Sequence, residues 1–112
     1  MKDDAVFLIH ILDSINQIEE YVNSLGYDDF VGRKLIQDGV IRQLEIIGEA
    51  TKRLSPELRK KYSHIPWEDV AGMRDKLIHH YFGVDLEAVW DTVGKDLPTL
   101  KEEVKKILQT LE

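Results

Sequence analysis

Apolar residues recur every three or four positions along most of the chain, which is the spacing of one face of an α-helix. Near the start, this spacing predicts a helix from about Asp4 to Leu25, which Gly26 is placed to end. The apolar stripe of this helix consists of Leu8, Ile11, Ile15, Ile18, Val22 and Leu25. The alternation typical of strands is nearly absent, so the pattern predicts an all-α protein.

A second apolar stripe predicts a helix that begins near Asp28 or Asp29 and ends near Leu54. Gly48 lies inside this helix, where glycine costs about 1 kcal/mol relative to alanine. A helix keeps such a glycine more readily where another backbone comes close. We therefore expect a second segment of the chain to approach Gly48.

Two prolines mark the starts of further helices. Ser55 is a capping residue followed by proline at the first helical position, and it predicts a short helix as far as about Tyr62. Pro66 repeats the pattern and predicts a helix that runs to about Phe82, where Gly83 breaks the chain.

The last predicted helix begins after Asp85, which can cap it, and runs to about Leu111. Pro98 lies inside this helix and is expected to kink or split it. The chain therefore has four long predicted helices and one short one, joined by short connections. This order predicts an up-and-down helical bundle, with residues 1–112 forming a single domain.

Composition narrows the class of protein. The chain has no cysteine, which excludes disulfides and thiolate metal sites. The acidic start does not resemble a signal peptide, and no apolar run approaches the roughly 20 residues that a membrane span needs. We expect a soluble cytoplasmic protein that does not associate with membranes.

Charge is distributed unevenly along the chain. The net charge is −6, which argues against non-specific binding to nucleic acid, yet residues 31–62 carry eight bases and four acids. This middle third forms either a basic surface or simply a solvated helix face.

Reactive side chains are concentrated in residues 73–81, which include Arg74, Asp75, His79, His80 and Tyr81. On one continuous helix, Asp75 and His79 are four positions apart and can meet, so that Asp75 orients the imidazole. Arg74 and His79 would lie about 140° apart around the helix, so one copy of the chain could not easily bring both side chains to the same substrate atom. Two copies across a dimer axis would pool two arginines and two histidines in one cleft.

Arginine with histidine suits metal-independent cleavage of RNA by its own 2′-hydroxyl. Histidine can act as base and acid, because its ordinary pKa lies near 6.5, and arginine can stabilise the charge that builds on the phosphate. A zinc site built on His79 and His80 is disfavoured, because adjacent histidines on a helix diverge. The Arg-x4-His spacing alone is also common on ordinary helix surfaces.

Longer motifs add specificity. The chain contains Ile65-Pro66-Trp67, Ala71-Gly72-Met73-Arg74-Asp75-Lys76-Leu77-Ile78-His79 and Tyr81-Phe82-Gly83-Val84-Asp85, preceded by Ile46-Ile47-Gly48-Glu49-Ala50 and Arg53-Leu54-Ser55. In order and spacing these blocks resemble the HepT-like HEPN toxins, over nearly the whole chain.

The resemblance implies an all-helical homodimer that acts as a metal-independent endoribonuclease without a cofactor, the toxin of a toxin–antitoxin pair. Arg74 and His79 correspond to the catalytic pair. The extended motif Arg-x4-His-x-Tyr is complete and ends at Tyr81, to which a nucleotidyltransferase antitoxin of the MntA type adds AMP in this family. Many HEPN proteins have Asn where this chain has Asp75. We expect Asp75 to position the catalytic pair without contacting the substrate.

Secondary expectations concern neighbouring side chains. His80 and Lys76 are candidates for contact with RNA. Arg42, Glu45 and Glu49 line one side of the second predicted helix and are expected to form an ion-pair ladder or to shape the cleft. Two other functions stay open: a non-catalytic helical dimer that binds and regulates a nucleotidyltransferase, and a plain structural bundle.

Overall fold

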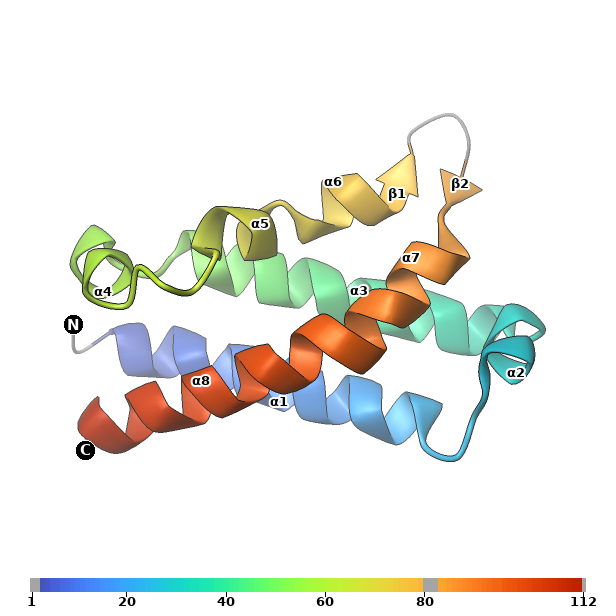
Figure 1. Ribbon diagram of the computed structural model, residues 1–112, viewed down its shortest axis with the longest axis horizontal. Helices are drawn as coiled ribbons and strands as arrows, with labels where there is room; N and C mark the ends of the chain where they lie inside the picture. Colours follow the sequence, from blue (N-terminus) through green and yellow to red (C-terminus); the bar gives the residue numbers. More distant parts are fainter. Residues whose placement is uncertain (1–2, 80–82, 112) are drawn as a thin grey trace.

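The computed structural model of the protein describes residues 3–79 and 83–111 and is built almost entirely from helices (Figure 1). In chain order the helical segments are α1 (Asp4–Val22), α2 (Tyr27–Val31), α3 (Lys34–Lys52), α4 (Pro56–Lys61), α5 (Trp67–Ala71), α6 (Met73–Leu77), α7 (Leu86–Asp91), the π-helical turn η1 (Thr92–Asp96) and α8 (Leu97–Leu111). The described strands are β1 (Ile78–His79) and β2 (Gly83–Val84), which pair antiparallel. The predicted all-α class is confirmed.

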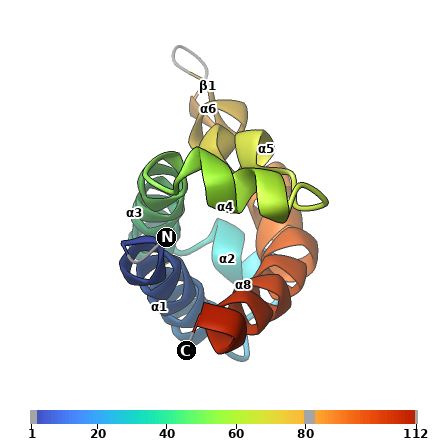
Figure 2. The ribbon, with the colours of Figure 1, turned by 90° about the vertical axis from the view of Figure 1, so that its left-hand side faces the viewer.

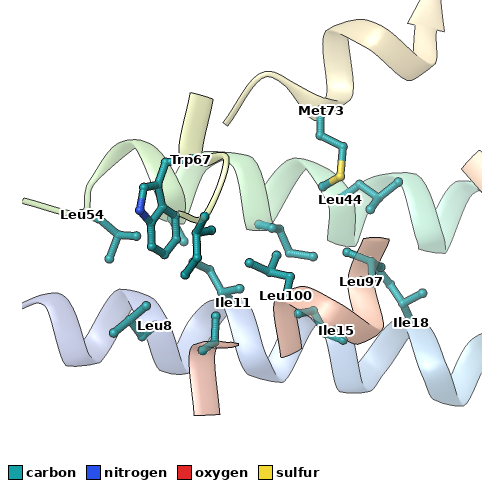
Figure 3. Close-up of a cluster of buried hydrophobic side chains, with 14 of the residues drawn as sticks. Leu8, Ile11, Ile15, Ile18, Leu44, Leu54, Trp67, Met73, Leu97 and Leu100 are labelled. Carbon is teal, nitrogen blue, oxygen red and sulfur yellow. The ribbon is translucent and has the colours of Figure 1, made fainter. Parts of the chain in front are cut away.

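Three long helices, α1, α3 and α8, form the body of the molecule, with α1 packed against both of the others (Figures 1 and 2). The predicted stripe of α1 faces inward, and Leu8, Ile11, Ile15 and Ile18 have no exposed surface. Figure 3 shows these side chains against Leu44 and Leu54 of the α3 side and Leu97 and Leu100 of α8. Burial of each large aliphatic side chain contributes about 1.5–3 kcal/mol.

The start of α4 follows the predicted capping. The Ser55 hydroxyl accepts a hydrogen bond from the Leu58 backbone N–H at 3.1 Å. The buried carboxylate of Asp4 accepts hydrogen bonds from the Ser55 N–H and hydroxyl, both at 2.7 Å. The first turn of α1 is thereby fixed to the start of α4.

The second predicted helix is in fact two helices, α2 and α3, separated at Gly32 and Arg33. The buried side chain of Gln37 explains why the break is stable, because its amide donates to the carbonyls of Phe30 and Val31 at 2.8 and 2.9 Å. These carbonyls lie at the end of α2, and in a continuous helix they would accept hydrogen bonds from backbone N–H groups of the next turn.

The split expected at Pro98 is confirmed, but it takes the form of a π-helical turn. The Leu97 N–H donates to the carbonyl of Thr92, five residues earlier. Proline has no N–H to donate to the carbonyl four residues before it, so the wider turn precedes it and α8 continues.

The helix expected from Pro66 to Phe82 is wrong in extent. It breaks at Gly72 into α5 and α6, and α6 ends at Leu77. Ile78 takes extended angles (φ −116°, ψ 109°), and the Asp85 N–H donates to the Leu77 carbonyl at 2.9 Å. Ile78 is β-branched and Gly83 has φ +82°, which favour a strand pair over continued helix.

The close approach expected at Gly48 is confirmed. A Cβ at this position would lie 3.0 Å from the carbonyl oxygen of Ala71 at the end of α5. Glycine at position 48 therefore lets the backbone of α5 rest directly on α3.

Gly48→Ala is expected to lower the free energy of unfolding by about 1–3 kcal/mol, because the added methyl group presses on backbone and not on a movable side chain. Gly94→Ala is the matched control, since a Cβ there meets nothing within 4 Å. Urea unfolding of both variants measures the difference. Equal or greater stability of Gly48→Ala would contradict the close-packing account.

Candidate functional site

Arg74 is the second residue of α6, and α6 lies over α3. Its Nε donates to the Oε2 atom of Glu45 on α3 at 3.0 Å. The Arg74 side chain is 49% exposed, so one edge of the guanidinium is held while much of the group faces solvent. Such an arginine is oriented from one side and retains N–H groups that can donate to an anion.

Glu45 is the partner that sequence analysis did not assign to Arg74. Residues 42, 45 and 49 were expected to form a ladder among themselves, but Glu45 pairs with Arg74 and Glu49 pairs with Lys52 at 3.3 Å. The predicted ladder among residues 42, 45 and 49 is therefore wrong. Glu45 contacts Arg74, and a role of these residues in shaping the cleft stays a prediction. The position of Glu45 one turn before Gly48, where α5 approaches, is the signal that indicates this pairing.

Asp75 follows Arg74 and is largely exposed, with an Oδ1 atom 3.6 Å from the Arg74 Nη1. This distance is too long for a hydrogen bond, so Asp75 acts on Arg74 through its charge. The helical geometry that would bring Asp75 to His79 is wrong, because α6 ends between them.

His79 lies in β1, where its backbone pairs with Gly83. His80 and Tyr81, the predicted RNA contact and modification site, lie outside the described residues. Arg74 thus lies in the first turn of a short helix and His79 in the strand that follows this helix, and their catalytic roles stay predictions.

Lys76, the other predicted RNA contact, lies on α6 and is exposed. Its Nζ donates to the Oδ1 atom of Asp69 on α5 at 2.8 Å. An exposed pair of this kind is weak enough for the lysine to exchange partners when a phosphate arrives.

A hollow of about 400 Å³ lies between the α5–α6 segment and α8. Met73 and Leu77 line it, whereas Arg74 does not, so this hollow is separate from the arginine site. At its edge the His64 Nε2 and Glu103 Oε2 atoms are 2.9 Å apart. The hydrogen bond with His64 lowers the pKa of the Glu103 carboxyl, which partial burial opposes.

Two negative observations apply to residues 3–79 and 83–111 alone. No three His, Asp or Glu side chains among them are grouped so as to hold a metal ion. No helix in the same ranges is long and apolar enough to cross a membrane.

The helical fold and the Arg-x4-His motif that follows Gly72 define an all-α domain of the HEPN type. Residues 11–107 match the family model described as "Ribonuclease HepT-like". The chain belongs to the HepT-like ribonuclease family.

Curated relatives agree with the family assignment. A Methanocaldococcus jannaschii protein named "Gamma-glutamylcyclotransferase and putative RNase" is 55% identical over 99% of this chain, which spans about half (50%) of that relative's length. A "putative RNase" of Caldanaerobacter subterraneus is 46% identical over 97% of both chains. The "Probable ribonuclease HepT" of Thermococcus cleftensis is 45% identical over 90% of this chain and 92% of its own. No solved structure matches the chain.

The Arg74–Glu45 pair is expected to contribute little to stability, because both side chains are partly exposed. A double-mutant cycle with Arg74→Ala and Glu45→Ala should give a coupling free energy of about 0.2–1 kcal/mol. The same cycle with Glu49→Ala in place of Glu45→Ala is the control and should give none. Zero coupling between residues 74 and 45 would show that the pair does not form in solution.

Proposed function

We propose that this chain is the ribonuclease toxin of a toxin–antitoxin pair, a metal-independent endoribonuclease whose site is completed by a second copy of the chain. The observation that carries the proposal is the Arg74 side chain, which Glu45 holds at one edge and which remains half exposed on the helix that leads into the strand of His79. Family membership and relatives named as ribonucleases support the same conclusion.

The reaction that suits these groups is transfer of the phosphate to the neighbouring 2′-hydroxyl of RNA. A base removes the 2′-hydroxyl proton, a bond forms between the 2′-oxygen and phosphorus, and the bond to the 5′-oxygen breaks. An acid protonates the leaving 5′-oxygen, so the products are a 2′,3′-cyclic phosphate and a 5′-hydroxyl. His79 supplies the base or acid, and the Arg74 guanidinium stabilises the negative charge on the phosphate.

One chain carries a single Arg74 and a single His79 in this motif, whereas the reaction needs both a base and an acid. A homodimer in which the two motifs face each other would provide two histidines and two arginines in one cleft. Because Arg74 is half exposed on a short helix, its guanidinium is open to a second copy without rearrangement of the core.

Control of the activity would act through Tyr81, two residues after His79. A nucleotidyltransferase antitoxin would transfer AMP from ATP: a bond forms between the tyrosine oxygen and the α-phosphorus, pyrophosphate leaves, and the phenol proton goes to solvent. The added phosphate is anionic and lies near the cationic motif in sequence, so it would compete with RNA for the arginines.

A second candidate is a non-catalytic dimer that regulates a nucleotidyltransferase. The net charge of −6 favours it, because an acidic protein repels RNA at long range.

Arg74→Ala and His79→Ala are each expected to lower RNA cleavage in EDTA by roughly 10²–10⁴-fold, because each removes one element of charge stabilisation or proton transfer. Arg33→Ala and His64→Ala, at exposed positions, are the matched controls. Circular dichroism first establishes that each variant is folded. Gel assays with the purified proteins then measure the rate of RNA cleavage. If Arg74→Ala and His79→Ala cleave RNA as fast as the parent, the catalytic assignment is wrong; if the parent never cleaves RNA, the regulatory dimer is favoured.

Coexpression with a nucleotidyltransferase of the MntA type is expected to add mass in whole AMP units and to abolish cleavage, because the modification would occupy the cleft. Tyr81→Phe should gain no mass and should stay active in the presence of the antitoxin, whereas Tyr27→Phe should behave as the parent. Intact-mass measurement shows whether AMP is added, and peptide mapping shows at which residue. Modification at another residue, or full activity of the modified protein, would contradict this mode of control.

A further inference from the structure

Five cations are grouped at the junction of α3 and α4, and we call them the α4 basic corner: Lys52, Arg53, Arg59, Lys60 and Lys61. Residues 52–61 contain one carboxylate, that of Glu57, and so carry a net charge of +4 in a chain of net charge −6. The basic middle third of the sequence is therefore concentrated in ten residues at one end of the molecule (Figure 1). Such a local potential attracts anions even when the whole protein is acidic.

Most described lysines and arginines outside this corner are ion-paired. Seven of the nine pair with a carboxylate, and Arg33 and Arg42 do not; the seven are Lys34, Arg74, Lys76, Lys95, Lys101, Lys105 and Lys106. Within the corner, Lys52 pairs with Glu49, and no described carboxylate pairs with the other four. Lys61 lies over the ring of Tyr62, 5.6 Å from its centre. Four cations of the corner thus keep their charge uncompensated by the part of the chain that the structure describes.

Arg59 provides a second, independent observation. Its Nε atom is buried and has no hydrogen-bond partner among the described residues. A buried N–H without a partner is unfavourable, and more so when the group is charged. Arg59 and Ser63 line a hollow of about 520 Å³ between α4 and α5. The carboxylates of Glu68 and of Asp69, which Lys76 engages, also line the hollow. The buried Nε is closed to a phosphate from solvent, so a phosphate contact of Arg59 would be made by its terminal nitrogens.

The corner is connected to the candidate site by one helix. Glu45, which holds Arg74, and Lys52 are seven residues apart on α3 and therefore share one face, about 10 Å apart along the axis. A single strand of RNA with one phosphate at Arg74 can reach Lys52, where the corner begins, within a few nucleotides. Proteins that bind single strands commonly combine such a basic track with site sizes of roughly 4–16 nucleotides.

We propose that the α4 basic corner binds the phosphodiester backbone of the RNA substrate outside the cleavage site, with Arg59, Lys60 and Lys61 as its phosphate contacts. This inference rests on the proposed ribonuclease function. It assigns affinity for long RNA to the corner and bond cleavage to the Arg74 motif. An acidic protein partner is the competing occupant, and the experiment below separates the two.

The test compares Lys60→Glu/Lys61→Glu with Lys105→Glu/Lys106→Glu, a matched pair of adjacent lysines on α8 that changes the net charge equally. The probe is a fluorescent, uncleavable 2′-O-methyl single-stranded RNA, followed by anisotropy. We expect the α4 variant to bind on the order of tenfold or more weakly than the control. In Lys60→Ala/Lys61→Ala, the slope of log K against log salt should fall by about 1.4, since each phosphate contact contributes about 0.7.

Cleavage of a dinucleotide, which is too short to reach the corner, separates this inference from the proposed function. Lys60→Ala/Lys61→Ala should retain parental dinucleotide cleavage and lose cleavage of long RNA at low concentration, whereas Arg74→Ala should lose both. Equal RNA binding by the α4 and α8 charge reversals would overturn the proposal. The proposal would also be overturned if the α4 charge reversal left RNA binding unchanged and abolished binding to the nucleotidyltransferase, because the corner would then bind a protein partner. If the parent cleaves nothing, the proposed function fails, and the anisotropy comparison still decides whether the corner binds RNA.

Discussion

The contact between Gly48 and the Ala71 carbonyl determines where the candidate site lies. Without a side chain at residue 48, the backbone of α5 rests on α3, and α6 follows after a single intervening residue. Arg74 is thereby delivered over α3 within 3.0 Å of Glu45, which is one turn from Gly48 on the same helix. The buried bundle of α1, α3 and α8 provides a rigid base for this arrangement.

Two groups of cations on this helical bundle, Arg74 and the α4 basic corner, differ in how they are held. An acidic chain gains nothing from non-specific attraction to RNA, so its cations must be placed where they act. Arg74 is held by Glu45 and keeps exposed N–H groups, which suits recognition of one phosphate. The α4 basic corner is largely unpaired in the described structure, which suits a longer stretch of backbone. The two surfaces are joined by α3, and in our proposal the first would serve cleavage and the second affinity.

Local rules predicted the local features well. The stripe of α1, the cap at Ser55 and the glycine at residue 48 each follow from short-range geometry, and the structure confirms them. The end of α6 at Leu77 was not predicted, because the helical spacing of apolar residues continues past it. The residues that follow have poor helical propensity, and their pairing with Gly83–Val84 is a tertiary contact that local spacing does not reveal. Similarly, the break before α3 depends on Gln37 reaching back to α2, and the Arg74–Glu45 pair joins residues 29 positions apart.

We propose that two copies of the chain complete one ribonuclease site. The RNA cleavage rate per chain in EDTA, measured across a dilution series in which sedimentation gives the dimer fraction at each concentration, tests this directly. We expect the rate per chain to fall in proportion to the dimer fraction. A monomer that cleaves as fast as the dimer, or a fully dimeric protein that does not cleave RNA, would contradict it.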